Sequence, residues 1–199
     1  MNPSDYKEAI EQITGCADLL RAAMETAALV TRVFAERGHE LVVVGGSAIE
    51  FYTEGSYMSG DIDLCKKRTA PIPLREQQDI MAQLDSRGGP RTWKVGPLFV
   101  DLLGTLENES TAPLRTLETP RGPVVLVPPE LLIVERVLSA TYPQQNGEEE
   151  ACAKKLLAAC LDNSVPIDWN EVTRLAALPS FGVGDALERF KGEVLHGPR

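Results

Sequence analysis

Apolar residues recur along the chain with two different spacings, and each spacing predicts a different kind of element. Between residues 4 and 38 the apolar positions are three or four apart, which predicts one or two helices ending at Gly38. From Gly147 onward helical spacing returns, with breaks at Pro166 and Pro179. The C-terminal part is therefore expected to be all helical.

Shorter apolar runs lie between these helical parts and predict strands. They cover residues 40–46, 61–65, 91–104 and 124–127. The runs are apolar, several are rich in β-branched residues, and glycine, proline or polar residues bound them, as is typical of strands. The run at 91–104 is divided at Gly96 and Pro97, which indicates a bend or a hairpin.

Further helices are expected around the strands, and one segment shows neither spacing. The helices are expected from Ser47 to about Gly55, from Pro71 and Pro73 to about Arg87, and onward from Pro128. Residues 105–121 are expected to be irregular. The whole pattern predicts an α+β fold, in which a mixed β-sheet core with covering helices occupies residues 1–127 and a helical region occupies residues 128–199.

Charge and cysteine use exclude several classes of protein. The 199-residue chain has a net charge of -9 and a pI near 4.8, which argues against a broad basic groove for long double-stranded nucleic acid. The four cysteines show no C-x-x-C spacing, and no histidine lies near one in sequence, so reduced thiols are expected instead of a disulfide frame or a zinc site. Because the chain shows no signal-peptide pattern and no apolar run of membrane-spanning length, we expect a cytoplasmic protein without membrane contact.

The strand expected at 40–46 ends in a glycine turn that is able to approach a phosphate. Gly45 and Gly46 allow close backbone approach, and the helix that follows offers N–H groups and a favourable dipole to an anion. Ser47 is expected to cap this helix, to contact a phosphate, or to do both. The turn lacks the lysine of a P-loop and the third glycine of a dinucleotide fingerprint. Taken alone, such a turn is more often an ordinary connection between a strand and a helix that binds no ligand.

Two aspartates flank Ile62 in the next expected strand. Side chains two apart on a strand point to one face, so Asp61 and Asp63 are expected to project together while Ile62 and Leu64 face the core. Two carboxylates on one face repel each other, and an oxygen-binding cation such as Mg²⁺ or Mn²⁺ would offset that repulsion. Ser59, two residues earlier, is able to reach the same face. The alternative is an acidic strand edge that faces solvent.

A third aspartate, Asp101, lies in the apolar run LFVDLLG. Its neighbours predict a strand covered on both faces, where an unpaired charge is costly. Residues 64–100 suffice for a crossover helix and a hairpin, so this strand is able to return beside residues 61–65 and bring Asp101 to the other two carboxylates. The alternative is an ion pair with Arg91, Lys94 or Arg115.

Together these residues resemble a known superfamily. G-G-S-A at Gly45–Ala48, D-I-D at Asp61–Asp63 and the later strand aspartate Asp101 resemble the motifs of the DNA polymerase beta-like nucleotidyltransferases. More closely, residues 42–64 look like the small bacterial nucleotidyltransferase-like proteins related to abortive-infection and toxin–antitoxin nucleotidyltransferases. The resemblance covers about residues 41–103, and it identifies residues 1–127 as a nucleotidyltransferase-like core.

The resemblance implies an enzyme that transfers a nucleoside monophosphate from an NTP such as ATP to a hydroxyl or phosphate acceptor and releases pyrophosphate. It implies that the nucleotide is bound by Gly45, Gly46, Ser47 and Ser59. It also implies that Mg²⁺ or Mn²⁺ is bound by Asp61, Asp63 and Asp101, with Asp101 helping to deprotonate the acceptor. The acceptor is left open among tRNA, a protein and a small molecule, and a neutralising protein partner is a further expectation.

Two basic positions differ from the family pattern. Relatives often have an arginine shortly before the aspartate pair, where this chain has Ser56, Tyr57 and Met58, and a lysine in the later helix, where Arg136 stands. The alternative is therefore a non-catalytic nucleotide-binding or partner-binding module of the same fold.

Overall fold

The computed structural model describes residues 3–67, 70 and 72–197, and the chain divides into two compact units. The first unit comprises Met1–Phe51, Met58–Glu107 and Arg115–Leu126, and the second comprises Tyr52–Tyr57, Asn108–Leu114 and Val127–Arg199. Pro71, expected at the start of a helix, lies outside the described residues. The division into domains 1–127 and 128–199 stays a prediction.

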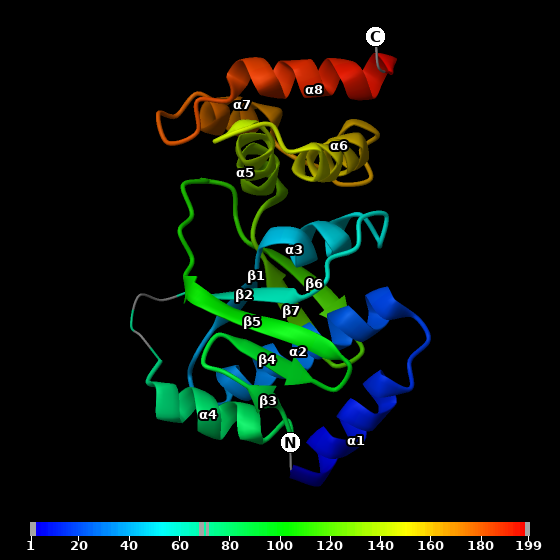
Figure 1. Ribbon diagram of the computed structural model, residues 1–199, viewed down its shortest axis with the longest axis vertical. Coiled ribbons are helices and arrows are strands. Elements are labelled where there is room, and N and C mark those ends of the chain that lie inside the picture. The colour runs from blue at the N-terminus through cyan, green and yellow to red at the C-terminus, as the bar shows by residue number, and fades with distance from the viewer. Residues whose placement is uncertain (1–2, 68–69, 71, 198–199) are drawn as a thin grey trace. The chain divides into compact units, whose positions relative to one another are not determined.

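A mixed sheet forms the centre of the first unit (Figure 1). Within the described ranges its strands are β1 (Leu41–Val43), β2 (Ile62–Lys66), β3 (Arg87–Gly88), β4 (Thr92–Val95), β5 (Leu98–Thr105), β6 (Arg115–Thr119) and β7 (Gly122–Leu126). Their order across the sheet is β3-β4-β5-β2-β1-β7-β6. Strand β2 is antiparallel to β1 and parallel to β5, whereas β1 is parallel to β7. The predicted α+β fold with a mixed sheet is confirmed.

Helix α2 (Leu19–Ala35) packs against the sheet and supplies much of the core of this unit. It contacts β1, β6 and β7, and it also contacts helices α1 (Pro3–Thr14) and α4 (Leu74–Ala82). Its apolar side chains recur at helical spacing, and Leu29, Val30 and Val33 are fully buried. The helical pattern predicted before Gly38 is therefore confirmed, as two helices.

Two parts of the chain differ from the sequence-based expectation. Helix α4 ends at Ala82 and not near Arg87, because Arg87 and Gly88 pair with β4 as a short strand. Residues 105–121 are not irregular throughout, since β6 forms an antiparallel hairpin with β7. The side chains of β6 are exposed or part-exposed, so this edge strand carries no apolar pattern to reveal it.

The second unit is built from helices, as predicted. They are α5 (Pro129–Thr141), α6 (Gly147–Leu161), α7 (Trp169–Ala176) and α8 (Gly184–His196). Helix α5 contacts the other three. Glu171 of α7 ties the segment 108–114 to this unit, because its carboxylate accepts hydrogen bonds from the Ser110 hydroxyl at 3.0 Å and the Thr111 N–H at 2.6 Å. Arg174 Nε donates a hydrogen bond to Glu171 Oε2 at 2.7 Å. This bond is the main reason that the pKa of Glu171 lies well below its usual range.

Two further features concern membrane spans and cysteines. In the part of the chain that the structure describes, no helix combines the length and the apolar character required to cross a membrane. Cys16, Cys65, Cys152 and Cys160 are free thiols in this structure.

Candidate active site

The sheet register places two of the predicted site residues side by side. Strands β2 and β5 are parallel, and Asp63 lies directly opposite Asp101. The chain between them contains α4 and the antiparallel pair β3–β4, so the predicted crossover is confirmed. Strand β4 turns into β5 at Gly96, whose φ of +56° lies in the left-handed region that favours glycine.

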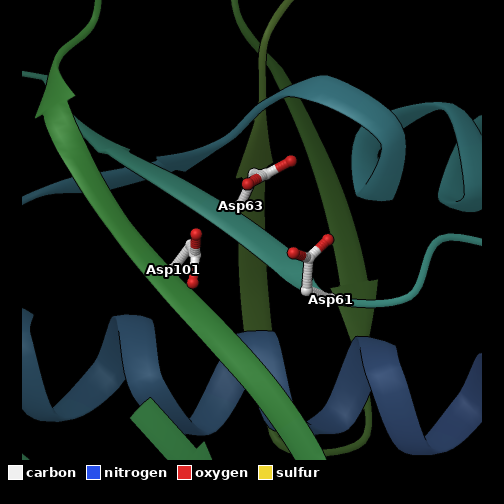
Figure 2. Close-up of side chains that lie close together, drawn as sticks. All are labelled: Asp61, Asp63 and Asp101. Carbon is white, nitrogen blue, oxygen red and sulfur yellow. The ribbon is translucent and has the colours of Figure 1, made fainter. Parts of the chain in front are cut away.

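The carboxylates of Asp61, Asp63 and Asp101 form one cluster, which we call the aspartate trio (Figure 2). One oxygen from each lies within 4.8 Å of the others, and all three residues are part-buried. Ile62 and Leu64 lie in the core at 2% and 0% exposure, so the predicted alternation along β2 is confirmed. The prediction that the strand begins at Asp61 was wrong by one residue, because pairing with β5 begins at Ile62.

Asp101 has an ion-pair partner in addition to the other two carboxylates. Its Oδ2 lies 3.4 Å from Nε of Arg91, so one of the alternative partners considered for Asp101 is present together with the trio. Its Oδ1 is buried and has no hydrogen-bond partner among the described residues. The prediction that both faces of this strand are covered was wrong, since Phe99 on the same strand is 47% exposed.

The glycine turn leads into helix α3 (Gly45–Tyr52) two residues earlier than predicted. Gly45 has a φ of +61°, which lets the chain turn from β1 directly into the helix. The prediction that Ser47 is the N-cap was therefore wrong, because Ser47 lies in the first turn and is 1% exposed. Its hydroxyl donates to the Val44 carbonyl at 3.0 Å and accepts from the Asp63 N–H at 3.1 Å. Ser47 thus fixes the helix start to the strand that carries Asp63.

Ser59 lies next to Asp61 and is held by a residue that the sequence analysis missed. The Ser59 hydroxyl donates to Asp61 Oδ1 at 3.4 Å, and its N–H donates to Oε2 of Glu50 at 2.8 Å. Glu50 belongs to α3, is only 3% exposed, and burial raises the pKa of its carboxyl group. The sequence does contain a signal for Glu50, because a glutamate stands between Ile49 and Phe51 in an otherwise apolar helix. Such a residue needs a buried partner, and here that partner is the backbone of the turn that leads to Asp61.

The residues present fit a divalent cation. Hard cations such as Mg²⁺ and Mn²⁺ prefer oxygen ligands, and the trio offers carboxylate oxygens alone. The buried Asp101 Oδ1 without a protein partner is the kind of atom that an ion would satisfy. A cation would also offset the repulsion among three carboxylates at this distance.

Comparisons with known proteins give a structural likeness and no sequence match. No protein-family model matches the chain, and no curated protein matches it. Among solved structures, an antigenic nucleotidyltransferase-like protein from Paracoccidioides brasiliensis is similar, with a TM-score of 0.53 and 14% identity over 86% of this chain and 93% of that one. The solution structure of the antibiotic-resistance factor ANT(2'')-Ia has a TM-score of 0.49 and 20% identity over 84% of this chain and 97% of that one.

A crystal structure of ANT(2'')-Ia in complex with adenylyl-2''-tobramycin has a TM-score of 0.45 and 18% identity over 74% of this chain and 91% of that one. At such identities the likeness concerns the fold alone, and only the structure from Paracoccidioides brasiliensis has a TM-score above 0.5 among these three. The predicted resemblance is confirmed at that level: the chain has the fold of nucleotidyltransferase-like proteins.

Proposed function

We propose that the chain is a metal-dependent nucleotidyltransferase that transfers a nucleoside monophosphate from an NTP to a hydroxyl or phosphate acceptor and releases pyrophosphate. The observation that carries this proposal is the convergence of Asp61, Asp63 and Asp101 within 4.8 Å. The nucleotidyltransferase-like fold gives that cluster a chemical context. A protein that needed only a stable sheet would gain nothing from three carboxylates that repel each other.

In this proposal the beginning of α3 binds the triphosphate. The first N–H groups of a helix have no partner within the helix, and the helix dipole favours an anion there. Gly45, Gly46 and Ser47 occupy this first turn. Ser59, whose hydroxyl donates to Asp61, would also contact the nucleotide.

Asp61, Asp63 and Asp101 would hold Mg²⁺ or Mn²⁺, and a bound ion supplies charge stabilisation for the attacking and leaving oxygens. The acceptor oxygen forms a bond to the α-phosphorus, while the bond from that phosphorus to the bridging oxygen breaks and pyrophosphate leaves with the electron pair. Asp101 accepts the proton of the acceptor hydroxyl.

The acceptor in this proposal is a hydroxyl or phosphate of tRNA, of a protein or of a small molecule, and ATP is the first nucleotide to test. We place the reaction in the cytoplasm, where thiols remain reduced, which accords with the four free cysteines. The resemblance to toxin–antitoxin nucleotidyltransferases makes a neutralising protein partner part of the same proposal.

The first prediction is label transfer that depends on the trio. The protein is incubated with each α-labelled NTP, Mg²⁺ or Mn²⁺, and bulk tRNA or cell extract. The wild type is expected to label an acceptor. The double variant Asp61→Ala plus Asp63→Ala is expected to lose at least about 100-fold in rate, because charge neutralisation at the phosphates is removed.

A matched control removes the same charge elsewhere in the first unit. Asp79 and Glu118 are exposed on α4 and β6, and the double variant Asp79→Ala plus Glu118→Ala is expected to label as well as the wild type. Equal labelling by the wild type and the trio variant would contradict the proposal. No labelling under any condition would favour the non-catalytic module.

A further inference from the structure

The backbone of Arg91 is fixed beside Asp101. The Leu102 N–H donates to the Arg91 carbonyl at 2.8 Å, and the next residue, Thr92, is paired with Asp101 across β4 and β5. The Trp93 indole N–H donates to the Pro90 carbonyl at 3.3 Å, which fixes the chain on the other side of Arg91. These contacts keep the Cα atom of Arg91 next to the trio.

The side chain of Arg91 is held far less firmly than its backbone. It is 70% exposed, and its ion pair with Asp101 at 3.4 Å is its only partner among the described residues. An exposed pair of this kind contributes little to stability. Arg91 also lines an open hollow with Gln77 and Leu102, so the side chain has space to leave Asp101.

A triphosphate at this site needs positive charge from the protein. Residues 55–60, which lead to Asp61, contain no lysine or arginine. Two lysines at the end of β2 bind elsewhere: Lys66 donates to the Ala70 carbonyl, and Lys67 pairs with Glu40 at 2.9 Å. Arg91 is a basic side chain in direct contact with the trio, and a guanidinium is well suited to phosphate because it donates two parallel hydrogen bonds.

We propose that Arg91 binds a phosphate of the incoming nucleotide and that, until the nucleotide arrives, it rests on Asp101 and competes there with the divalent cation. This inference rests on the proposed nucleotidyltransferase function, and it adds a binding residue and a control on metal loading. Before binding, Arg91 offsets part of the charge of the trio and occupies the Oδ2 side of Asp101. When the metal and nucleotide bind, the guanidinium exchanges that carboxylate for phosphate oxygens of the nucleotide.

The second prediction is that removing Arg91 changes two affinities in opposite directions. Mn²⁺ binding is measured by electron paramagnetic resonance without nucleotide, and binding of a non-hydrolysable α,β-methylene NTP is measured by calorimetry with Mn²⁺ present. In Arg91→Ala, Mn²⁺ alone is expected to bind about two- to fivefold more tightly, because a competing exposed ion pair is gone. The analogue is expected to bind about tenfold more weakly, because charge-assisted hydrogen bonds to phosphate are lost.

Two further variants separate this role from a structural one. Arg91→Lys keeps the charge but not the paired donors, so its affinity for the analogue is expected between those of the wild type and Arg91→Ala. Lys94→Ala removes the same charge three residues later in the chain, on β4, where the ammonium lies over the Phe99 ring, and it is expected to change neither affinity more than about twofold.

Because Mn²⁺ affinity is expected to rise and analogue affinity to fall in Arg91→Ala, the measurements can contradict the proposal. Unchanged affinities in Arg91→Ala, or a fall in both, would overturn the role of Arg91 while leaving the proposed function intact. A wild type that binds neither Mn²⁺ nor the analogue would overturn the proposed function itself, and this inference with it.

Discussion

At the scale of single residues, the site depends on buried polar groups outside the aspartate trio. Glu50 is such a group, because its carboxylate accepts the Ser59 N–H at 2.8 Å and so fixes the turn that carries Asp61. It does so at a cost, since burial disfavours the charged form and raises its pKa. Stability should therefore respond to the protonation of this side chain.

The third prediction concerns Glu50→Gln and pH. A carboxyl group whose pKa is raised in the folded state binds more protons there than in the unfolded chain, so folding stability falls as pH rises from the unfolded value toward the folded one. Glutamine still accepts the Ser59 N–H but never ionises. Urea unfolding at pH 5 and pH 8 should show that the stability of Glu50→Gln relative to the wild type increases with pH. Glu107→Gln, at an exposed position, should show no such increase, and identical pH dependence in all three proteins would contradict this account.

The residues of the trio were predictable from sequence, whereas their supports were not. Asp61 and Asp63 are two apart around an apolar residue, and that spacing alone predicts a shared face. Glu50 and Arg91 act through partners 9 and 10 positions away, and no local period relates such residues. Arg91 was identified only as one of three alternative partners for Asp101, because register across β4 and β5 cannot be read from either strand alone.

At the scale of elements, helix α3 links the glycine turn at Gly45 to strand β2, which carries Asp63. Its start is tied to β2 through Ser47, and the Val44 N–H donates to the Asp63 carbonyl at 3.0 Å. The Val44 bond continues the pairing of β1 with β2, whereas the Ser47 bond depends on the chain turning at Gly45, where φ is +61°. An L side chain at that position has to adopt a conformation that is unfavourable for it.

The fourth prediction is that Gly45→Ala destabilises the first unit. Placing a side chain in the left-handed region costs about 1–2 kcal/mol, which should appear as a lower free energy of unfolding in urea. Gly104 on β5 is the control, because a Cβ added there meets no atom within 4 Å and no positive φ is present. Gly104→Ala is expected to be neutral or slightly stabilising. A loss of stability in Gly104→Ala as large as that in Gly45→Ala would show that the backbone conformation is not the cause.

Elements that face the core were easier to predict than elements at an edge. Strands β1 and β2 and helix α2 bury a regular set of apolar side chains, so their spacing is visible in the sequence. Strand β6 is an edge strand with exposed or part-exposed side chains, and its pairing with β7 is fixed by backbone bonds that leave no apolar pattern. The early start of α3 was missed for a related reason, since Ser47 looks like a capping residue but bonds to Val44 and Asp63 instead.

At the scale of the whole molecule, the trio adds to a charge imbalance that already opposes folding. The chain carries a net charge of -9, and three of its carboxylates converge within 4.8 Å. Like charges this close favour any state in which they separate, and the unfolded chain is such a state. A site of this kind is expected to lower stability until a cation binds, which is a common cost of function.

The fifth prediction is that Asp61→Asn reverses its effect on stability when metal is added. Asparagine keeps an oxygen that accepts from Ser59 but removes one charge from the trio, so with a chelator present the variant should melt about 2–4 °C above the wild type. Excess Mn²⁺ binds the folded wild type and should stabilise it by about 2.7 kcal/mol at 100 times the dissociation constant, whereas the variant should gain much less. Asp79→Asn, exposed on α4, removes the same charge from the chain and should respond to Mn²⁺ as the wild type does. An Asp61→Asn protein that is less stable than the wild type with chelator, or equally stabilised by Mn²⁺, would show that the three carboxylates do not act together on a cation.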